Sequence, residues 1–200
     1  MLVITLSGIS ARAAEAIAEP RLVVPVRVHL LQSTNQPQVH TTLTETDVRR
    51  VFGKVNRVWA PARISFTIES IIKEQARTAA VPDENPKDRW LQGVIPNGSR
   101  ATNAFNVYYV KRMQPNGYWS GGVVFVKDTA SLKEVPGGID EPLPRVTSHE
   151  LGHALGLAHR QDRTNLMASG TTGTALSEEE IQTARAAASR RGWVKTAKEK

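Results

Sequence analysis

The residues whose types and spacing could do chemistry form a short motif in the last third of the chain. His149, Glu150, His153, Gly156 and His159 fit the pattern His-Glu-x-x-His-x-x-Gly-x-x-His. A helix would place the imidazoles of His149 and His153 one turn apart on the same face. Gly156 can adopt a positive φ and end that helix, which lets His159 turn back to the same point. Three neutral nitrogens with one open position are typical of a catalytic zinc site.

Glu150 completes the chemistry that this motif predicts. It is rotated about a quarter turn from the histidines on the same helix, so its carboxylate would lie beside a metal without binding it. Zinc lowers the pKa of a bound water, and Glu150 could take the proton as general base. The alternative is a helical core whose histidines are satisfied by hydrogen bonds. Three of the 5 histidines fall in this one motif, which favours the metal site.

The motif and a second segment together resemble the metzincin metalloproteases. Asn165-Leu166-Met167-Ala168 is similar to the Met-turn of that family, which implies that Met167 packs beneath the metal as a structural residue. The resemblance implies a zinc-dependent endopeptidase with one catalytic zinc and a protein or peptide substrate. Small bacterial matrixin-like peptidases look most similar. Arg160 stands where the named subfamilies usually have another residue, so the subfamily stays open.

Two alternatives to an active protease follow from the same residues. One is a zinc-containing binding module without catalytic activity, although nothing in the motif is missing. The other is a site in which Glu178, Glu179 or Glu180 replaces His159 as the third ligand. The position of Gly156, which would turn the chain toward His159, argues against that second arrangement.

Length and composition predict one basic domain. The chain has 200 residues, 40% of them hydrophobic, and a net charge of +7. A basic surface is the simplest interpretation, and binding to acidic polymers is the alternative. No nucleic-acid motif accompanies the charge, so we expect no nucleic-acid partner. We also expect a monomer. The absence of cysteine (Cys 0) rules out disulfides, thiolate ligands and the cysteine-switch latency of matrixins.

The N-terminus has the pattern of a secretory signal. An apolar run at residues 2–9 is followed by Ala11-Arg12-Ala13, a small-x-small cleavage site. We therefore expect a signal peptide at 1–13, a short leader at 14–20 and a secreted or periplasmic protein. The apolar run is too short to span a membrane. The leader leaves no room for an inhibitory propeptide, so latency would require a separate protein inhibitor or secretion itself.

Periodicity predicts an α/β (α+β) catalytic domain at 21–192 with a basic tail at 193–200. The elements expected along the chain are strands at 21–31, 63–72, 104–111 and 121–127, a helix from residue 44, the zinc helix, and a helix over 177–191. The first strand, helix and second strand suggest a parallel βαβ unit. The metzincin resemblance implies a twisted mixed sheet of four to five strands with a zinc-binding helix, a Met-turn and a C-terminal helix.

The resemblance also implies where a substrate would lie. In metzincins the strand corresponding to residues 121–127 is antiparallel at the sheet edge, and an extended peptide can pair with such an edge. We therefore expect Gly121, Gly122, Val123 and Val124 to form the substrate rim, the alternative being an edge strand that binds nothing. Asn116-Gly117 is expected to be a turn.

A calcium site has little support from the sequence. Asp83, Glu84 and Asp88 supply the oxygen ligands that calcium prefers, but their spacing matches no known calcium loop. A solvated acidic patch is the better interpretation.

Overall fold

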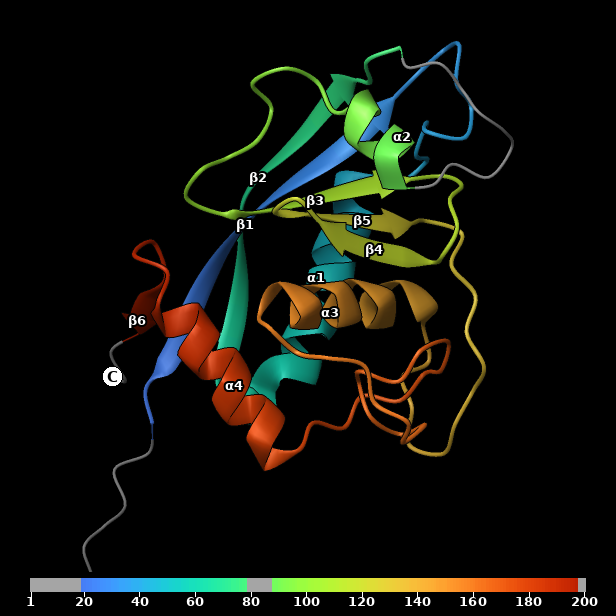
Figure 1. Cartoon of the computed structure of the whole chain (residues 1–200). Coiled ribbons are helices and arrows are strands. Elements are labelled where there is room, and N and C mark those ends of the chain that lie inside the picture. Colours follow the sequence, from blue (N-terminus) through green and yellow to red (C-terminus); the bar gives the residue numbers. More distant parts are fainter. Residues whose placement is uncertain (1–18, 79–87, 198–200) are drawn as a thin grey trace, which may run out of the picture.

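The computed structural model describes residues 19–78 and 88–197. A mixed sheet forms the centre of the molecule, with helices on both faces (Figure 1). The elements, in chain order, are β1 (Arg21–Gln32), α1 (Glu45–Trp59), the 3₁₀ turn η1 (Ala60–Ala62), β2 (Ile64–Gln75), α2 (Asp88–Val94), β3 (Phe105–Val110), β4 (Gly117–Ser120), β5 (Val123–Lys127), α3 (Pro142–Ala154), α4 (Glu178–Ser189) and β6 (Lys195–Ala197). The strand order is β2-β1-β3-β5-β4, and β6 pairs with β1. The predicted α/β class is confirmed, and the short strands β4 and β6 add to the four strands expected along the chain.

The predicted βαβ unit is formed by β1, α1 and β2. The two strands pair in parallel, as the helical connection between them requires. Thr44 caps α1 through a capping box, since its hydroxyl accepts from Asp47 N at 3.2 Å and the Asp47 carboxylate accepts from Thr44 N at 2.9 Å. Pro61 lies in the 3₁₀ turn that ends the helix, as its lack of an N–H predicts.

Two apolar cores cover the two faces of the sheet. On one face, the alternating residues Val24, Val26 and Val28 of β1 pack with the apolar sides of α1 and α3. On the other face, Trp90 and Leu91 of α2 pack against β3 and β5. These two residues attach the 73–102 segment to the body of the protein.

The predicted sheet edge is wrong. The strand expected there, β5, pairs in parallel with β3 and lies between β3 and β4, and Val123 and Val124 are buried. The antiparallel edge strand is β4, which begins at the predicted turn residue Gly117. The turn lies at Gly121 and Gly122 instead, whose φ angles are 57° and 80°. Two successive positive φ angles suit a tight hairpin, and glycine adopts them without strain.

The helix that carries the zinc motif, α3, begins at a proline. Glu141 occupies the N-cap position and Pro142 follows at the first helical position. The Glu141 side chain makes no capping hydrogen bond and instead pairs with Arg50 and, at 3.0 Å, with Lys54 of α1. These ion pairs connect the start of α3 to α1, which lies beside it in Figure 1.

Gly156 ends this helix as predicted. Its φ is 86°, its N–H donates to His153 O at 2.9 Å, and the next N–H, from Leu157, donates to Gly152 O at 3.0 Å. These two bonds form a Schellman motif, which reverses the chain and satisfies the last carbonyl groups of the helix.

The predicted C-terminal helix is present as α4, and the basic tail after it contains a strand that the sequence did not predict. Ser177 and Glu180 form a capping box at the start of α4. The expected basic tail is in part a strand, because β6 pairs antiparallel with Arg21–Val23 of β1. Its pairing satisfies β1 backbone groups that β3, which begins to pair only at Val26, does not reach.

The structure describes neither the N-terminal residues nor all of the acidic patch. The predicted signal peptide lies outside the described residues, as do Asp83 and Glu84 of the acidic patch. Within 19–78 and 88–197, no helix has the length and apolar character needed to cross a bilayer.

Substitution of Gly156 should destabilise the protein. Gly156→Ala places a Cβ on a residue with φ of 86°, and we expect the free energy of unfolding to fall by about 1 kcal/mol in urea denaturation. Gly53→Ala is the matched control, because Gly53 lies inside α1 with nothing within 4 Å of the added Cβ. The control should raise stability by about 0.5–1 kcal/mol. Equal effects of the two substitutions would contradict this account of the helix end.

Candidate zinc site

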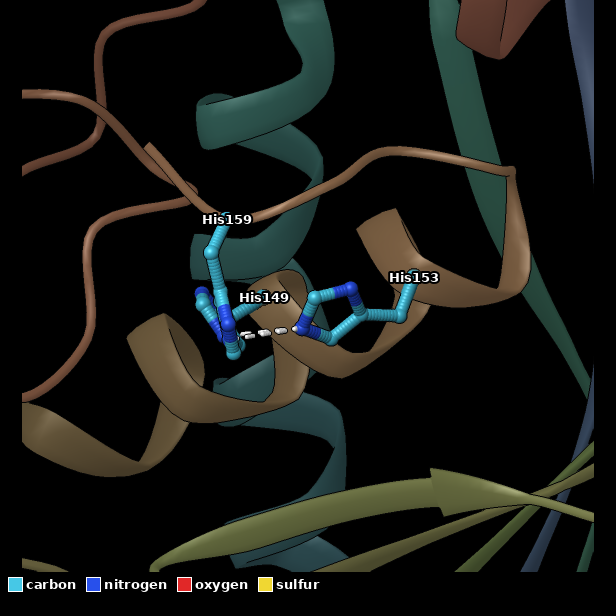
Figure 2. Close-up of side chains that lie close together, drawn as sticks. All are labelled: His149, His153 and His159. Carbon is cyan, nitrogen blue, oxygen red and sulfur yellow. Dashed lines mark hydrogen bonds between the residues drawn. The ribbon is translucent and has the colours of Figure 1, made fainter. Parts of the chain in front are cut away.

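The structure brings His149, His153 and His159 together. His149 and His153 lie on α3, and the chain after Gly156 returns to place His159 opposite them (Figure 2). The Nε2 atom of His153 is 3.1 Å from both other Nε2 atoms, and the His149–His159 distance is 3.3 Å. Within the described part of the chain, this is the one group of three or more His, Cys, Asp or Glu side chains arranged to hold a metal ion.

These distances fit a tetrahedral zinc ion. Zinc–nitrogen bonds of about 2.0–2.1 Å at tetrahedral angles separate the nitrogens by about 3.3–3.4 Å. Hydrogen bonds also hold the Nδ1 atoms, which lie on the side of each ring away from the cluster. His149 Nδ1 donates to Leu166 O and His153 Nδ1 donates to Leu157 O, each at 2.8 Å. Such bonds to carbonyl oxygens fix the tautomer that leaves the Nε2 lone pairs free for a metal.

Burial keeps the first two histidines neutral. It lowers the pKa of His149 to about 3, against the weaker opposing effect of the hydrogen bond to Leu166 O. It also lowers the pKa of His153. Neutral imidazole is the form that binds zinc, so the environment favours the ligand state of both side chains.

Glu150 is buried beside the histidines, at 5% exposure. Burial raises the pKa of its carboxyl group to about 8, and the charge of Arg145 acts in the opposite direction. A carboxyl group with such a pKa can take up and release a proton near neutral pH. Gly117 of β4 packs directly over it, because a Cβ at Gly117 would lie 2.5 Å from Glu150 Oε1.

Sequence reasoning missed Arg145, which lies on α3 one turn before His149 and is only 1% exposed. Its guanidinium donates to Gly173 O at 2.9 Å, to Asn165 O at 3.3 Å and to Ala168 O. It therefore attaches the Met-turn segment to α3. An arginine on an otherwise apolar stretch of the helix was the available signal, since a buried cation needs several acceptors.

The Nη1 atom of Arg145 also lies 3.0 Å from His149 Nδ1. That nitrogen already donates to Leu166 O, so two N–H groups face each other and the contact is not a hydrogen bond. The nearby positive charge nevertheless disfavours protonation of His149.

Met167 is fully buried and packs against α3 at Gly152. A Cβ at Gly152 would lie 2.6 Å from the Met167 sulfur, so only glycine permits this contact. Asn165 Oδ1 accepts from Met167 N at 2.6 Å and stabilises the turn. Met167 thus lies against the residue that precedes His153.

The three glutamates considered as alternative ligands lie outside the histidine cluster. Glu180 pairs with Arg160 at 3.0 Å and accepts from Asn165 Nδ2 at 2.8 Å, and Glu179 pairs with Arg160 at 3.2 Å. Arg160 also donates its backbone N–H to Met167 O at 3.0 Å. The unusual residue after the third histidine therefore connects the Met-turn to α4.

A pocket of about 620 Å³ opens at the histidines. Its walls include the three histidines and Glu150, together with Gly117, Tyr118 and Trp119 of β4. None of the residues predicted as the substrate rim lines this pocket: Gly121, Gly122, Val123 and Val124. The edge strand beside the pocket is β4, one strand further out than the strand of residues 123–127 that was expected there.

Removing a histidine of the cluster should remove the metal. We expect about one zinc per chain in the wild type and a loss of zinc affinity of more than about 100-fold in His153→Ala and His159→Ala. Metal analysis after dialysis against a chelator buffer measures both. His40→Ala and Glu178→Gln, which lie outside the cluster, should keep their zinc. Zinc retention in His159→Ala together with loss in Glu178→Gln would reject this ligand set.

Comparison with known proteins agrees with the fold and the site. Residues 98–185, from the segment before β3 into α4, match the model of the matrixin family. The search of curated proteins found no match. Among solved structures, mirolysin in complex with compound 9 superposes with a TM-score of 0.60 at 12% identity, covering 84% of this chain and 91% of that chain.

Two further structures have the same architecture. Archaemetzincin from Methanopyrus kandleri gives a TM-score of 0.56 at 11% identity, covering 84% of this chain and 96% of that one. Metalloproteinase-II from Bacteroides fragilis gives 0.58 at 12% identity, covering 85% of this chain and 55% of that one. Together with the matrixin match and the histidine cluster, these findings support a zinc metallopeptidase. The chain therefore has a metzincin-like fold, and the part of it that carries the three histidines matches the matrixin family.

Proposed function

We propose that the protein is a zinc-dependent endopeptidase that cleaves peptide bonds in the pocket beside the three histidines. The observation that carries the proposal is the arrangement of a buried carboxyl group, Glu150, in the same pocket as His149, His153 and His159. The three histidines would hold the metal through their Nε2 atoms. When bound, zinc supplies a Lewis acid that polarises a carbonyl and lowers the pKa of water.

Glu150 does the proton transfer in this proposal. Its carboxylate accepts the proton of the attacking water, and the carboxylic acid so formed gives that proton to the leaving nitrogen of the cleaved bond. Burial raises the pKa of Glu150 to about 8, close to the neutral range in which one carboxyl group can serve first as a base and then as an acid. Gly117 allows the carboxylate to lie directly beneath the edge strand.

The edge strand β4 supports the binding of an extended peptide. One side of β4 pairs with β5, and no strand among residues 19–78 and 88–197 pairs with its other side, where main-chain hydrogen bonds to a peptide could form. Tyr118 and Trp119 line the pocket, and Trp119 is 39% exposed, so an aromatic surface lies where substrate side chains would pass. We propose that the enzyme acts outside the cytoplasm, on the basis of the leader pattern at residues 2–13.

Loss of the carboxylate should abolish cleavage without removing zinc. For Glu150→Gln we expect about one zinc per chain and a fall in kcat of at least about 100-fold on a casein or peptide-library substrate. In the wild type, 1,10-phenanthroline should stop cleavage. Wild-type rates in Glu150→Gln would refute the mechanism. Bound zinc with no cleavage of any substrate by the wild type would favour a zinc-containing binding module instead.

An added methyl group on β4 should act through Glu150. In Gly117→Ala the new Cβ would lie 2.5 Å from Glu150 Oε1 and 2.6 Å from Val146 Cγ1, so the carboxylate must move. A displacement of this size should lower kcat/KM at least about tenfold while the zinc content stays unchanged. Gly192→Ala, whose Cβ meets nothing within 4 Å, is the control and should keep wild-type activity. Full activity in Gly117→Ala would show that the position of Glu150 is not limiting.

A further inference from the structure

A second pocket adjoins the histidine pocket and carries positive charge. It has a volume of about 530 Å³, and we call it the cationic pocket. Its lining includes Lys133, His159, Arg160, Arg163, Ser169 and Gly170. Three of these are lysine or arginine, and no aspartate or glutamate lines it.

The cations of this pocket differ in how far they are neutralised. Arg160 is paired with Glu179 and Glu180 of α4. For Lys133 and Arg163, no ion pair occurs among residues 19–78 and 88–197. Two positive charges therefore face the pocket without a bound carboxylate.

The acidic neighbours of these cations in the sequence do not line the pocket. Asp162 accepts from the N–H and hydroxyl of Thr164, both at 2.9 Å, which engages its carboxylate elsewhere. Glu134 follows Lys133 along the chain and is also absent from the lining. The net charge at the pocket surface is positive.

Hydrogen bonds hold the backbone of the pocket in place. Lys133 N donates to Gly170 O at 2.9 Å, and Thr172 N donates to Lys133 O at 3.0 Å. The Thr171 hydroxyl donates to Arg163 O at 2.7 Å. The segments that carry Lys133 and Arg163 are therefore both joined to residues 170–172, which follow the Met-turn. This positions the two residues relative to the histidines.

The two pockets share His159, Ser169 and Gly170. A peptide bound beside the histidines can therefore reach the cationic pocket with a side chain near the cleaved bond. Carboxylates are the side chains that Lys and Arg bind best, and Ser169 adds a hydroxyl donor. Building on the endopeptidase function, we propose that the cationic pocket binds an aspartate or glutamate side chain of the substrate.

The test is a cleavage-site profile. A peptide library made from a proteome digest is cleaved by wild type and by Lys133→Gln/Arg163→Gln, and the cleaved sites are read by mass spectrometry. We expect wild type to favour Asp or Glu at one fixed position near the cleaved bond. For one such peptide and its Gln counterpart, the preference in kcat/KM should be about fivefold to tenfold, as suits exposed ion pairs. In the double variant the two peptides should be cleaved with about equal kcat/KM. In the wild type the preference for the acidic peptide should weaken at high salt.

A matched control separates local binding from overall charge. Lys73→Gln/Arg190→Gln removes the same two charges from exposed positions that line neither pocket. It should keep the wild-type preference. An absent acidic preference in wild type, its persistence in Lys133→Gln/Arg163→Gln, or its loss in the control would overturn the proposal. Failure of the endopeptidase function itself would look different, because no peptide, acidic or neutral, would be cleaved in a chelator-sensitive way.

Discussion

The site depends on three imidazoles whose Nε2 atoms converge within 3.3 Å of one another. Burial keeps His149 and His153 neutral, so these two rings do not repel each other as like charges at this distance would. Two backbone carbonyls fix the tautomer of these rings by accepting hydrogen bonds from the Nδ1 N–H groups of His149 and His153. One belongs to Leu157 in the turn after the helix and the other to Leu166 beside Met167. The helix end and the Met-turn therefore both hold the ligand geometry.

Arg145 holds the wall of the pocket in place. A guanidinium buried to 1% exposure is costly unless its donors are paired, and carbonyl oxygens of residues 165–173 supply the partners. The loop in turn acquires a fixed position over α3. Residues 169 and 170 of this loop border both pockets. The loop that the buried Arg145 holds in place therefore also lies beside the exposed Lys133 and Arg163. Arg145 orders the loop, whereas Lys133 and Arg163 are available to bind a ligand.

The sequence predicts this protein best where the determinants are local. The capping boxes at Thr44 and Ser177, the positive φ of Gly156 and the helical spacing of the histidines all depend on residues within a few positions of each other. The edge strand was misplaced because two turn signals compete, Asn116-Gly117 and Gly121-Gly122. The parallel pairing of β5 with β3, which is not its neighbour along the chain, places β5 inside the sheet and leaves β4 at the edge. The partners of Arg145 and the strand formed by the basic tail were missed for the same reason.

The pairing of β6 with β1 affects how the chain can fold. The first strand of the described fold lies against the last, over Arg21–Val23 and Lys195–Ala197. This contact spans nearly the whole sequence, and contacts of such long range slow folding because a large loop must close first. Until Lys195–Ala197 pairs with it, the start of β1 presents unpaired backbone groups on that side, the kind of open edge that recruits strands from other chains. Completion of the sheet and protection of this edge from aggregation therefore depend on the same pairing.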